Sequence, residues 1–179
     1  MNKSILPAIA IAFAFSMPSM AQDGLLKKYA RLLTTPRHYV CHRTNEKIKI
    51  DGKLNEKSWA KAADTESFVD ISGDGFPKPI YDTKARMMWN DEYLYVSAVM
   101  EEPNIVANLT QRDTIIYHDN DFEVFLDPTG DGQCYFEIEN NARGVVFDLM
   151  LDRAYRSGGN FYVQWDCPGL KLAVNHDGT

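Results

Sequence analysis

The sequence has few cysteines, no cluster of basic residues and no Cys-x-x-Cys pair. Its three cysteines, Cys41, Cys134 and Cys167, allow at most one intramolecular disulfide, so the chain is not a disulfide scaffold. The missing Cys-x-x-Cys pair removes the common zinc and thiol-redox motifs. The 19 Lys and Arg residues are scattered and outnumbered by 25 Asp and Glu residues, which argues against nucleic acid as a partner.

A long apolar run is also missing outside the first 21 residues. Lys3 precedes an apolar run from Ile5 to Phe15, and the stretch ends in the small-x-small pattern Ser19-Met20-Ala21. A membrane-spanning helix needs roughly 18 to 20 apolar residues, and no later run approaches that length. We therefore predict a cleaved signal peptide over residues 1–21, a secreted or periplasmic mature chain, and no membrane span.

The next segment, residues 22–46, is a lead-in to the main domain. It predicts one short amphipathic helix, because apolar residues recur in it at helical spacing: Leu25, Leu26, Tyr29, Leu32 and Leu33. The period changes to 2 from Ile48, and an Asp51-Gly52 turn follows. Asn55 is the predicted N-cap of a brief helix that ends by Asp64, with Leu54 and Trp59 at the spacing of a hydrophobic staple.

Short alternating runs separated by Gly, Pro, Asn and Asp turns make up the remainder. They cover residues 65–71, 84–89, 93–101, 121–127, 135–140, 145–151, 161–165 and 170–174. Many short strands at this spacing predict an all-β fold, an antiparallel β-sandwich of jelly-roll or immunoglobulin-like type over residues 47–179. The last residues, 175–179, have the signature of a hairpin turn without a returning strand, so we expect the sandwich to be incomplete and the chain to be a truncated form of a longer protein.

The strand at 121–127 has two different faces. Phe122, Val124 and Leu126 form the predicted core face, and the opposite face carries the acidic residues and Phe125. The strand at 135–140 adds Tyr135, Glu137 and Glu139. Carboxylates beside exposed aromatic rings suit sugar binding, because the ring packs on a pyranose while the carboxylates accept its hydroxyl protons. A solvated sheet face without a ligand explains the same alternation, and the pattern alone favours that explanation.

Four ordered motifs resemble carbohydrate-binding module family 9 and its relatives in sugar-degrading bacteria. They are Ile50-Asp51-Gly52-Lys53-Leu54-Asn55-Glu56 with Trp59, the segment from Trp89 to Val96, the segment from Asp119 to Asp127, and Tyr135-Phe136-Glu137-Ile138-Glu139-Asn140 with Gly144. The resemblance runs from about Ile48 to Thr179. It implies a β-sandwich that binds polysaccharides or oligosaccharides, that occurs beside xylan- or glucan-degrading glycoside hydrolases, and that is often stabilised by calcium.

The resemblance also suggests site residues. Tyr117 occupies the position of the first of two aromatic residues that clamp a sugar in the family, and Glu123 matches a sugar-binding Glu. Glu137 stands where characterised members carry an Arg that contacts sugar, and Asn140 ends the same motif. We count all four among the predicted sugar-contacting residues. The second clamp aromatic of the family would lie beyond Thr179.

A calcium loop is suggested at the turn that follows residue 126. Asp127, Thr129 and Asp131 before Gly132 resemble the start of such a loop, but the twelfth position is Ile138 and not a bidentate Glu, so it is no EF-hand. A hairpin turn explains the same residues without a metal, and we favour it.

Two other function classes remain as alternatives. Glu123 and Glu137 on neighbouring strands could form a glycosidase pair, although a solvated face would not raise a carboxyl pKa as a general acid requires. Related sandwiches of the DOMON type hold haem between a Met and a His, here His118 with one of Met87, Met88, Met100 and Met150, although Met on an alternating strand usually fills a core. We expect a non-catalytic binding module.

Overall fold

The computed structural model describes residues 19–30, 35–73 and 75–176, which fall into two units, 1–39 and 40–179. The described part of the first unit contains helix α1 (Ser19–Lys28). This helix begins earlier than predicted and runs through Ala21, the proposed cleavage site, while most of the proposed signal peptide and Leu32 and Leu33 lie outside the described residues. Within the described residues, no helix combines the length and apolar character needed to cross a membrane.

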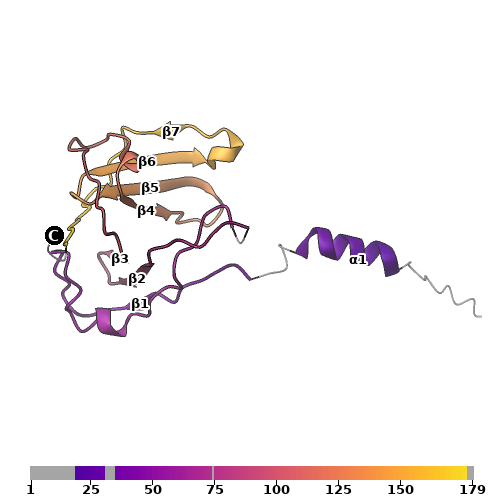
Figure 1. Cartoon of the computed structure of the whole chain (residues 1–179), viewed down its shortest axis with the longest axis horizontal. Coiled ribbons are helices and arrows are strands. Elements are labelled where there is room, and N and C mark those ends of the chain that lie inside the picture. Colours follow the sequence, from indigo (N-terminus) through magenta and orange to yellow (C-terminus); the bar gives the residue numbers. More distant parts are fainter. Residues whose placement is uncertain (1–18, 31–34, 74, 177–179) are drawn as a thin grey trace, which may run out of the picture. The chain divides into compact units, whose positions relative to one another are not determined.

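The second unit is an all-β sandwich of two sheets, as predicted (Figure 1). One sheet has the order β1-β2-β3 and the other β4-β5-β6-β7. Neighbouring strands are antiparallel except β1 and β2, which are parallel. The strands are β1 (His42–Arg43), β2 (Thr83–Trp89), β3 (Leu94–Met100), β4 (Asp121–Leu126), β5 (Gln133–Asn141), β6 (Val146–Arg153) and β7 (Phe161–Tyr162).

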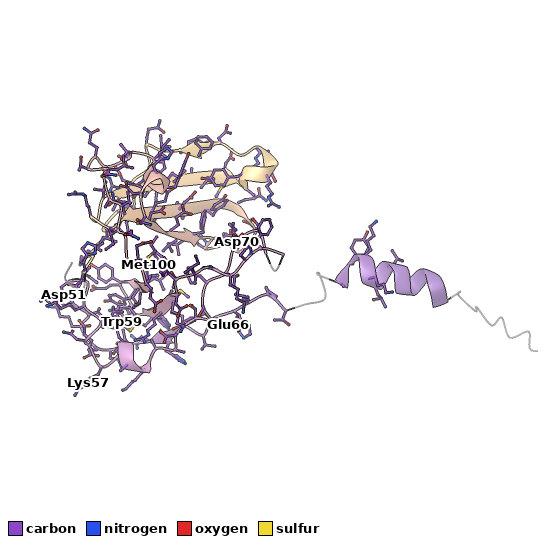
Figure 2. All side chains as sticks on the ribbon, viewed as in Figure 1. Asp51, Lys57, Trp59, Glu66, Asp70 and Met100 are labelled. Carbon is purple, nitrogen blue, oxygen red and sulfur yellow. The ribbon has the colours of Figure 1, made fainter. Side chains whose placement is uncertain are left out.

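The three-stranded sheet has a small core around Trp59, which is 3% exposed and begins the 3-10 helix η2 (Trp59–Lys61) (Figure 2). Leu54 packs on the same cluster, as the staple spacing predicted. The predicted cap was wrong, since the helix follows Ser58 and not Asn55. Ser58 Oγ instead donates a hydrogen bond of 2.7 Å to Glu46 Oε2, which ties this helix to the chain before it.

The four-stranded sheet has a second core that includes a residue from outside the sheet. Ile116, in the 3-10 helix η3 (Ile116–His118), is fully buried against three residues of β6, namely Phe147, Leu149 and Leu151. The segment that precedes β4 therefore covers one face of this sheet. Because η3 is a single tight turn, its neighbouring side chain, Tyr117, stays exposed.

Two predicted strands are absent from the described residues. In the segment 65–71, Thr65 N donates to Ala85 O and Phe68 N to Thr83 O, so the segment follows β2 without being assigned as a strand. Residues 170–174 form an extended segment without strand pairing. β1 was not predicted because two residues are too short for an alternation to show.

We expect Gly52→Ala to destabilise the sandwich by about 2 kcal/mol. Gly52 has φ +75°, and a Cβ there would lie 2.8 Å from Asn175 Cβ and from the Asn175 backbone nitrogen. Gly130 has a similar φ of +70° but nothing within 4 Å. Gly130→Ala should therefore cost only about 1 kcal/mol for backbone strain. Urea unfolding measures the free energy of unfolding of both variants. An equal loss in the two variants would contradict the packing of residues 174 and 175 against this turn.

Candidate functional site

The site lies on the acidic face of β4 and β5, which is more enclosed than predicted. Glu137 is 4% exposed and Glu139 is 3% exposed. The register places Glu137 between Phe125 and Leu149, and Glu139 between Glu123 and Phe147. The prediction of a solvated face was therefore wrong for β5, because a segment distant in sequence covers it. We call the carboxylates of Asp121, Glu123, Glu137 and Glu139 the acidic cluster.

The opposite face of the sheet is covered as well, but incompletely. Phe122, Val124 and Leu126 are half-buried, as is Phe136. Phe122 stacks on Phe68 with ring centroids 6.3 Å apart, and Phe136 stacks on Trp165 at 4.5 Å. The predicted core face is thus packed, and both faces of this sheet contribute to the interior.

Burial changes the acid strength of the acidic cluster. Desolvation, together with the charges of Asp121 and Glu137, raises the pKa of Glu123 to about 7. Desolvation and neighbouring acidic charges raise the pKa of Glu139 to about 8. Desolvation also raises the pKa of Glu137, although Tyr155 Oη donates a 2.6 Å hydrogen bond to its Oε2. The expectation that this face could not raise a carboxyl pKa was wrong.

Tyr117 lies beside this face, on a segment whose backbone is fixed by hydrogen bonds. Its side chain is 61% exposed, and its ring lies 4.6 Å from that of His118, while η3 contacts β5. Asp119, which follows η3, accepts hydrogen bonds of 2.9 Å from the backbone nitrogens of Asn108 and Leu109. The exposed ring therefore stands on a segment whose backbone is held in place.

The structure puts Asn140 on the other face of β5, away from Glu137 and Glu139. Its side chain donates a long hydrogen bond of 3.3 Å to Asn141 O. Asn141 is the asparagine on the acidic face, and it is fully buried. Sequence reasoning missed it, although the alternation of residues 135, 137 and 139 leads to 141.

The proposed calcium residues belong to a tight hairpin turn. Asp127 Oδ1 accepts from Gly130 N at 2.9 Å, and its Oδ2 accepts from Gly132 N at 2.7 Å. Thr129 Oγ1 donates to Asp131 Oδ1 at 2.8 Å. These hydrogen bonds hold the turn together without a metal, and calcium binding at these residues stays a prediction.

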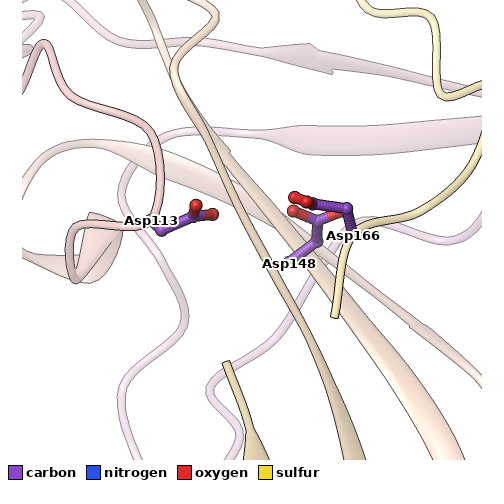
Figure 3. A group of neighbouring side chains, drawn as sticks. All are labelled: Asp113, Asp148 and Asp166. Carbon is purple, nitrogen blue, oxygen red and sulfur yellow. The ribbon is translucent and has the colours of Figure 1, made fainter. Parts of the chain in front are cut away.

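A second acidic group, which the sequence analysis did not predict, surrounds Arg112. Asp113, Asp148 and Asp166 come from three separate parts of the chain (Figure 3). Arg112 forms ion pairs with all three, including one with the fully buried Asp148. Asp148 also accepts from Cys167 N at 2.6 Å. Asp148 is the one acidic residue within the apolar run 146–151 of β6, and this is the sequence feature that could have indicated a buried ion pair.

The residues named for haem binding and for a disulfide lie in different parts of the fold. Met88 is buried in the core of the first sheet, whereas His118 and Met100 are exposed. The cysteines Cys41, Cys134 and Cys167 are unbridged in the described chain. A groove of about 860 Å³ is lined by residues 103–108, 142–143, Val174 and His176, none of them a predicted sugar-contacting residue.

Comparison with known protein families shows to which family the chain is related. Residues 50–162 match the family described as carbohydrate family 9 binding domain-like. The chain belongs to this family. Two relatives are similar to it, the "Exoglucanase XynX" of Acetivibrio thermocellus, 33% identical over 101 residues, and the "Endo-1,4-beta-xylanase C" of Paenibacillus barcinonensis, 29% identical over 102 residues. Each match covers 55% of this chain but only 8% of the relative, and no solved structure matches.

Membership of this family makes the chain a carbohydrate-binding domain. The match includes the acidic cluster and Tyr117, and it confirms the resemblance drawn from the four motifs. The family is one of binding domains, and the relatives in which similar segments occur carry the names of a glucanase and a xylanase.

Proposed function

We propose that the chain is an exported, non-catalytic module that binds a polysaccharide or oligosaccharide of the xylan or glucan class. One observation carries this proposal. The Tyr117 ring is exposed beside a sheet face that carries several carboxylates, and hydrogen bonds fix the segment on which it stands. The signal-like pattern of residues 1–21 supports export, and the names of the two relatives support the ligand class.

Tyr117 would supply a stacking platform for the sugar. Burying an exposed aromatic ring against the C–H groups of a pyranose removes apolar surface from water. Because Ile116 and Asp119 anchor the residues on both sides of Tyr117, little conformational freedom would be lost on binding.

Glu123 would supply the polar contacts. It is the exposed member of the acidic cluster, so a ligand can reach it from solvent. A carboxylate oxygen accepts hydrogen bonds from sugar hydroxyls, and the protonated form can also donate one. With a pKa of about 7, Glu123 offers both forms near neutral pH.

Tyr117→Ala should weaken binding by about 1 kcal/mol or more, roughly a fivefold loss of affinity. Affinity electrophoresis through gels containing xylan, β-glucan or mannan identifies the retarding polysaccharide, and calorimetry with its oligosaccharides measures the loss. Tyr81→Ala is the matched control, since Tyr81 is also a half-exposed tyrosine but precedes β2 in the other sheet.

An unchanged affinity of the Tyr117 variant, or an equal loss in both variants, would remove Tyr117 from the site. Absence of retardation in every polysaccharide, from a chain that migrates as a compact band, would contradict the proposed ligand class. Release of reducing sugar from xylan or glucan would contradict the non-catalytic assignment.

A further inference from the structure

Aromatic side chains from three strands lie on one face of the four-stranded sheet. Phe125 is on β4, Tyr135 on β5 and Phe161 on β7. Tyr135 and Phe161 both pair with Leu151 of β6, so the register sets them in one line across the sheet. Phe125 shares their face because it pairs with Glu137, which lies two residues after Tyr135.

Tyr155 connects these rings between β5 and β7. It begins the 3-10 helix η4 (Tyr155–Ser157), which follows β6. Its hydroxyl donates a 2.6 Å hydrogen bond to Glu137 on β5, and its ring centroid lies 6.3 Å from that of Phe161 on β7. The centroids of Phe125 and Tyr135 are also 6.3 Å apart. We call these four residues the aromatic row: Phe125, Tyr135, Tyr155 and Phe161.

The aromatic row is open to solvent and held in place. Phe125 and Tyr155 are each 51% exposed and Phe161 is 59% exposed, while Tyr135 is half-buried. Strand pairing fixes the backbone of three members, and the hydrogen bond to the buried Glu137 fixes the ring of Tyr155. A ligand that stacks on these rings therefore meets a preformed surface, which reduces the entropy lost on binding.

The size of the aromatic row favours a narrow ligand over a protein. An aromatic side chain buries 150–250 Å² when fully covered, so the three half-exposed rings offer about 300 Å². Each partner in a stable protein complex buries about 800 Å². The row is therefore too small for a second copy of this chain, but it suits the flat face of a chain of rings.

Polar side chains border the aromatic row on its outer side. Gln133 and Arg153 are exposed and pair with each other across β5 and β6. They lie on the same face as the rings, because Gln133 comes two residues before Tyr135 and Arg153 two residues after Leu151. Apolar rings beside amide and guanidinium groups suit a sugar chain, since the rings cover its C–H faces and the polar groups hydrogen-bond its hydroxyls.

The aromatic row and Tyr117 are attached at different ends of the sheet. Asp119, two residues after Tyr117, accepts a 2.9 Å hydrogen bond from Asn141 at the end of β5. Tyr135 lies six residues before Asn141 in this strand, which corresponds to about 20 Å. A single sugar stacked on Tyr117 would leave the row open, whereas a longer chain that follows the face could cover both.

We propose that the aromatic row is a second sugar-binding surface, which holds further units of the same polysaccharide chain that Tyr117 contacts. This inference rests on the proposed function and deepens it, because it makes the ligand an extended oligosaccharide of several units and not a single sugar. The row adds stacking contacts on a preformed surface, so each further unit that reaches it should strengthen binding.

The test is calorimetry of the whole chain with xylo-oligosaccharides and cello-oligosaccharides, from the disaccharide to the hexasaccharide. The original chain should bind the hexasaccharide at least about fivefold more tightly than the disaccharide. Phe161→Ala should remove most of this increase and leave the affinity for the disaccharide unchanged. Phe125→Ala, on a different strand, should show the same selective loss, whereas Tyr117→Ala should weaken binding at every length.

Tyr162→Ala is the matched control. Tyr162 is the neighbour of Phe161 on β7 and is 42% exposed, but it pairs with Met150 and so lies on the opposite face. This variant should keep the full dependence on length. The inference alone is overturned if the disaccharide and hexasaccharide bind equally to the original chain, or if the Phe161 and Tyr162 variants behave alike. Failure to bind any of these oligosaccharides would instead contradict the proposed function, and this inference with it.

Discussion

Asn141→Ala is expected to lower the free energy of unfolding by about 3 kcal/mol or more. Asn141 is fully buried and uses its whole side-chain amide. Its Nδ2 donates to Leu109 O and to Asp119 Oδ2, both at 2.9 Å, and its Oδ1 accepts from Arg143 N and Val145 N, both at 3.0 Å. Alanine would remove the side-chain hydrogen bonds to the backbone nitrogens of Arg143 and Val145, to the carbonyl oxygen of Leu109 and to the carboxylate of Asp119.

The same substitution should also weaken sugar binding. Asn141 joins β5 to the segment before β4, through Leu109 and Asp119, and that segment presents Tyr117. Once this link is lost, ordering of the segment has to accompany binding, which costs affinity. Urea unfolding followed by the fluorescence of the three tryptophans measures stability, and calorimetry measures affinity.

Asn140→Ala is the matched control for this prediction. Asn140 is the neighbouring asparagine, half-buried, with one long hydrogen bond of 3.3 Å. Its loss should cost less than about 1 kcal/mol. Equal destabilisation by the two substitutions would show that the Asn141 network is not what holds the segment.

The second large expected effect is a change of stability with pH. In buffer without divalent cations, the free energy of unfolding should fall as the pH rises from about 5 to about 9. The pKa of Glu123 is raised to about 7 and that of Glu139 to about 8, from an ordinary value of 4.5. Between these values the folded chain holds protons that the unfolded chain has released. The slope of the unfolding free energy with pH is therefore negative, and the stabilisation is lost as the pH passes through the folded pKa values.

The size of this fall is limited by solvent. One unit of pKa corresponds to about 1.4 kcal/mol, but Glu123 is partly exposed and the two acids titrate as a coupled pair. We expect a net fall of about 2 to 3 kcal/mol after allowing for solvent screening. Urea unfolding at a series of pH values measures it.

Two comparisons make the pH prediction specific. Glu139→Gln should give a flatter profile because its side chain does not titrate, whereas the exposed Glu92→Gln should follow the original chain. A free energy of unfolding that stays level or increases from pH 5 to pH 9 would contradict the burial of the acidic cluster. At lower pH the trend should reverse, because hydrogen bonds, first from Gly132 N, hold the pKa of Asp127 below its ordinary value.

The strands that the sequence predicted best are those with clear two-residue alternation. β2, β3, β4, β5 and β6 all fall within one or two residues of the predicted runs, since alternation reports directly on the pleat of a strand. Residues 65–71 alternate similarly, but their backbone hydrogen bonds to β2, from Thr65 N and Phe68 N, do not form a ladder. A ladder needs a partner in register, and one strand's sequence does not say whether that partner is present.

The candidate site was predicted in its residue types but not in its environment. Glu123 and Glu137 lie on β4 and β5, two of the strands that alternation predicted, and Tyr117 lies in η3, while their part in sugar binding stays a prediction. The burial of Glu137 and Glu139 depends on Ile116 and the chain before it folding back over β6. That contact joins residues about 30 positions apart, so alternation within β5 could not show it.

The sequence alone thus determined the fold class, the family and the list of acids from which the site is built, because local periodicity and ordered motifs are properties of the chain itself. The tertiary structure decided which of those acids are buried together. Asp113, Asp148 and Asp166 meet at Arg112, while Asp121, Glu123 and Glu139 meet without a cation from the described chain. The difference arises from strand register and loop packing, which bring together charges that are far apart in sequence.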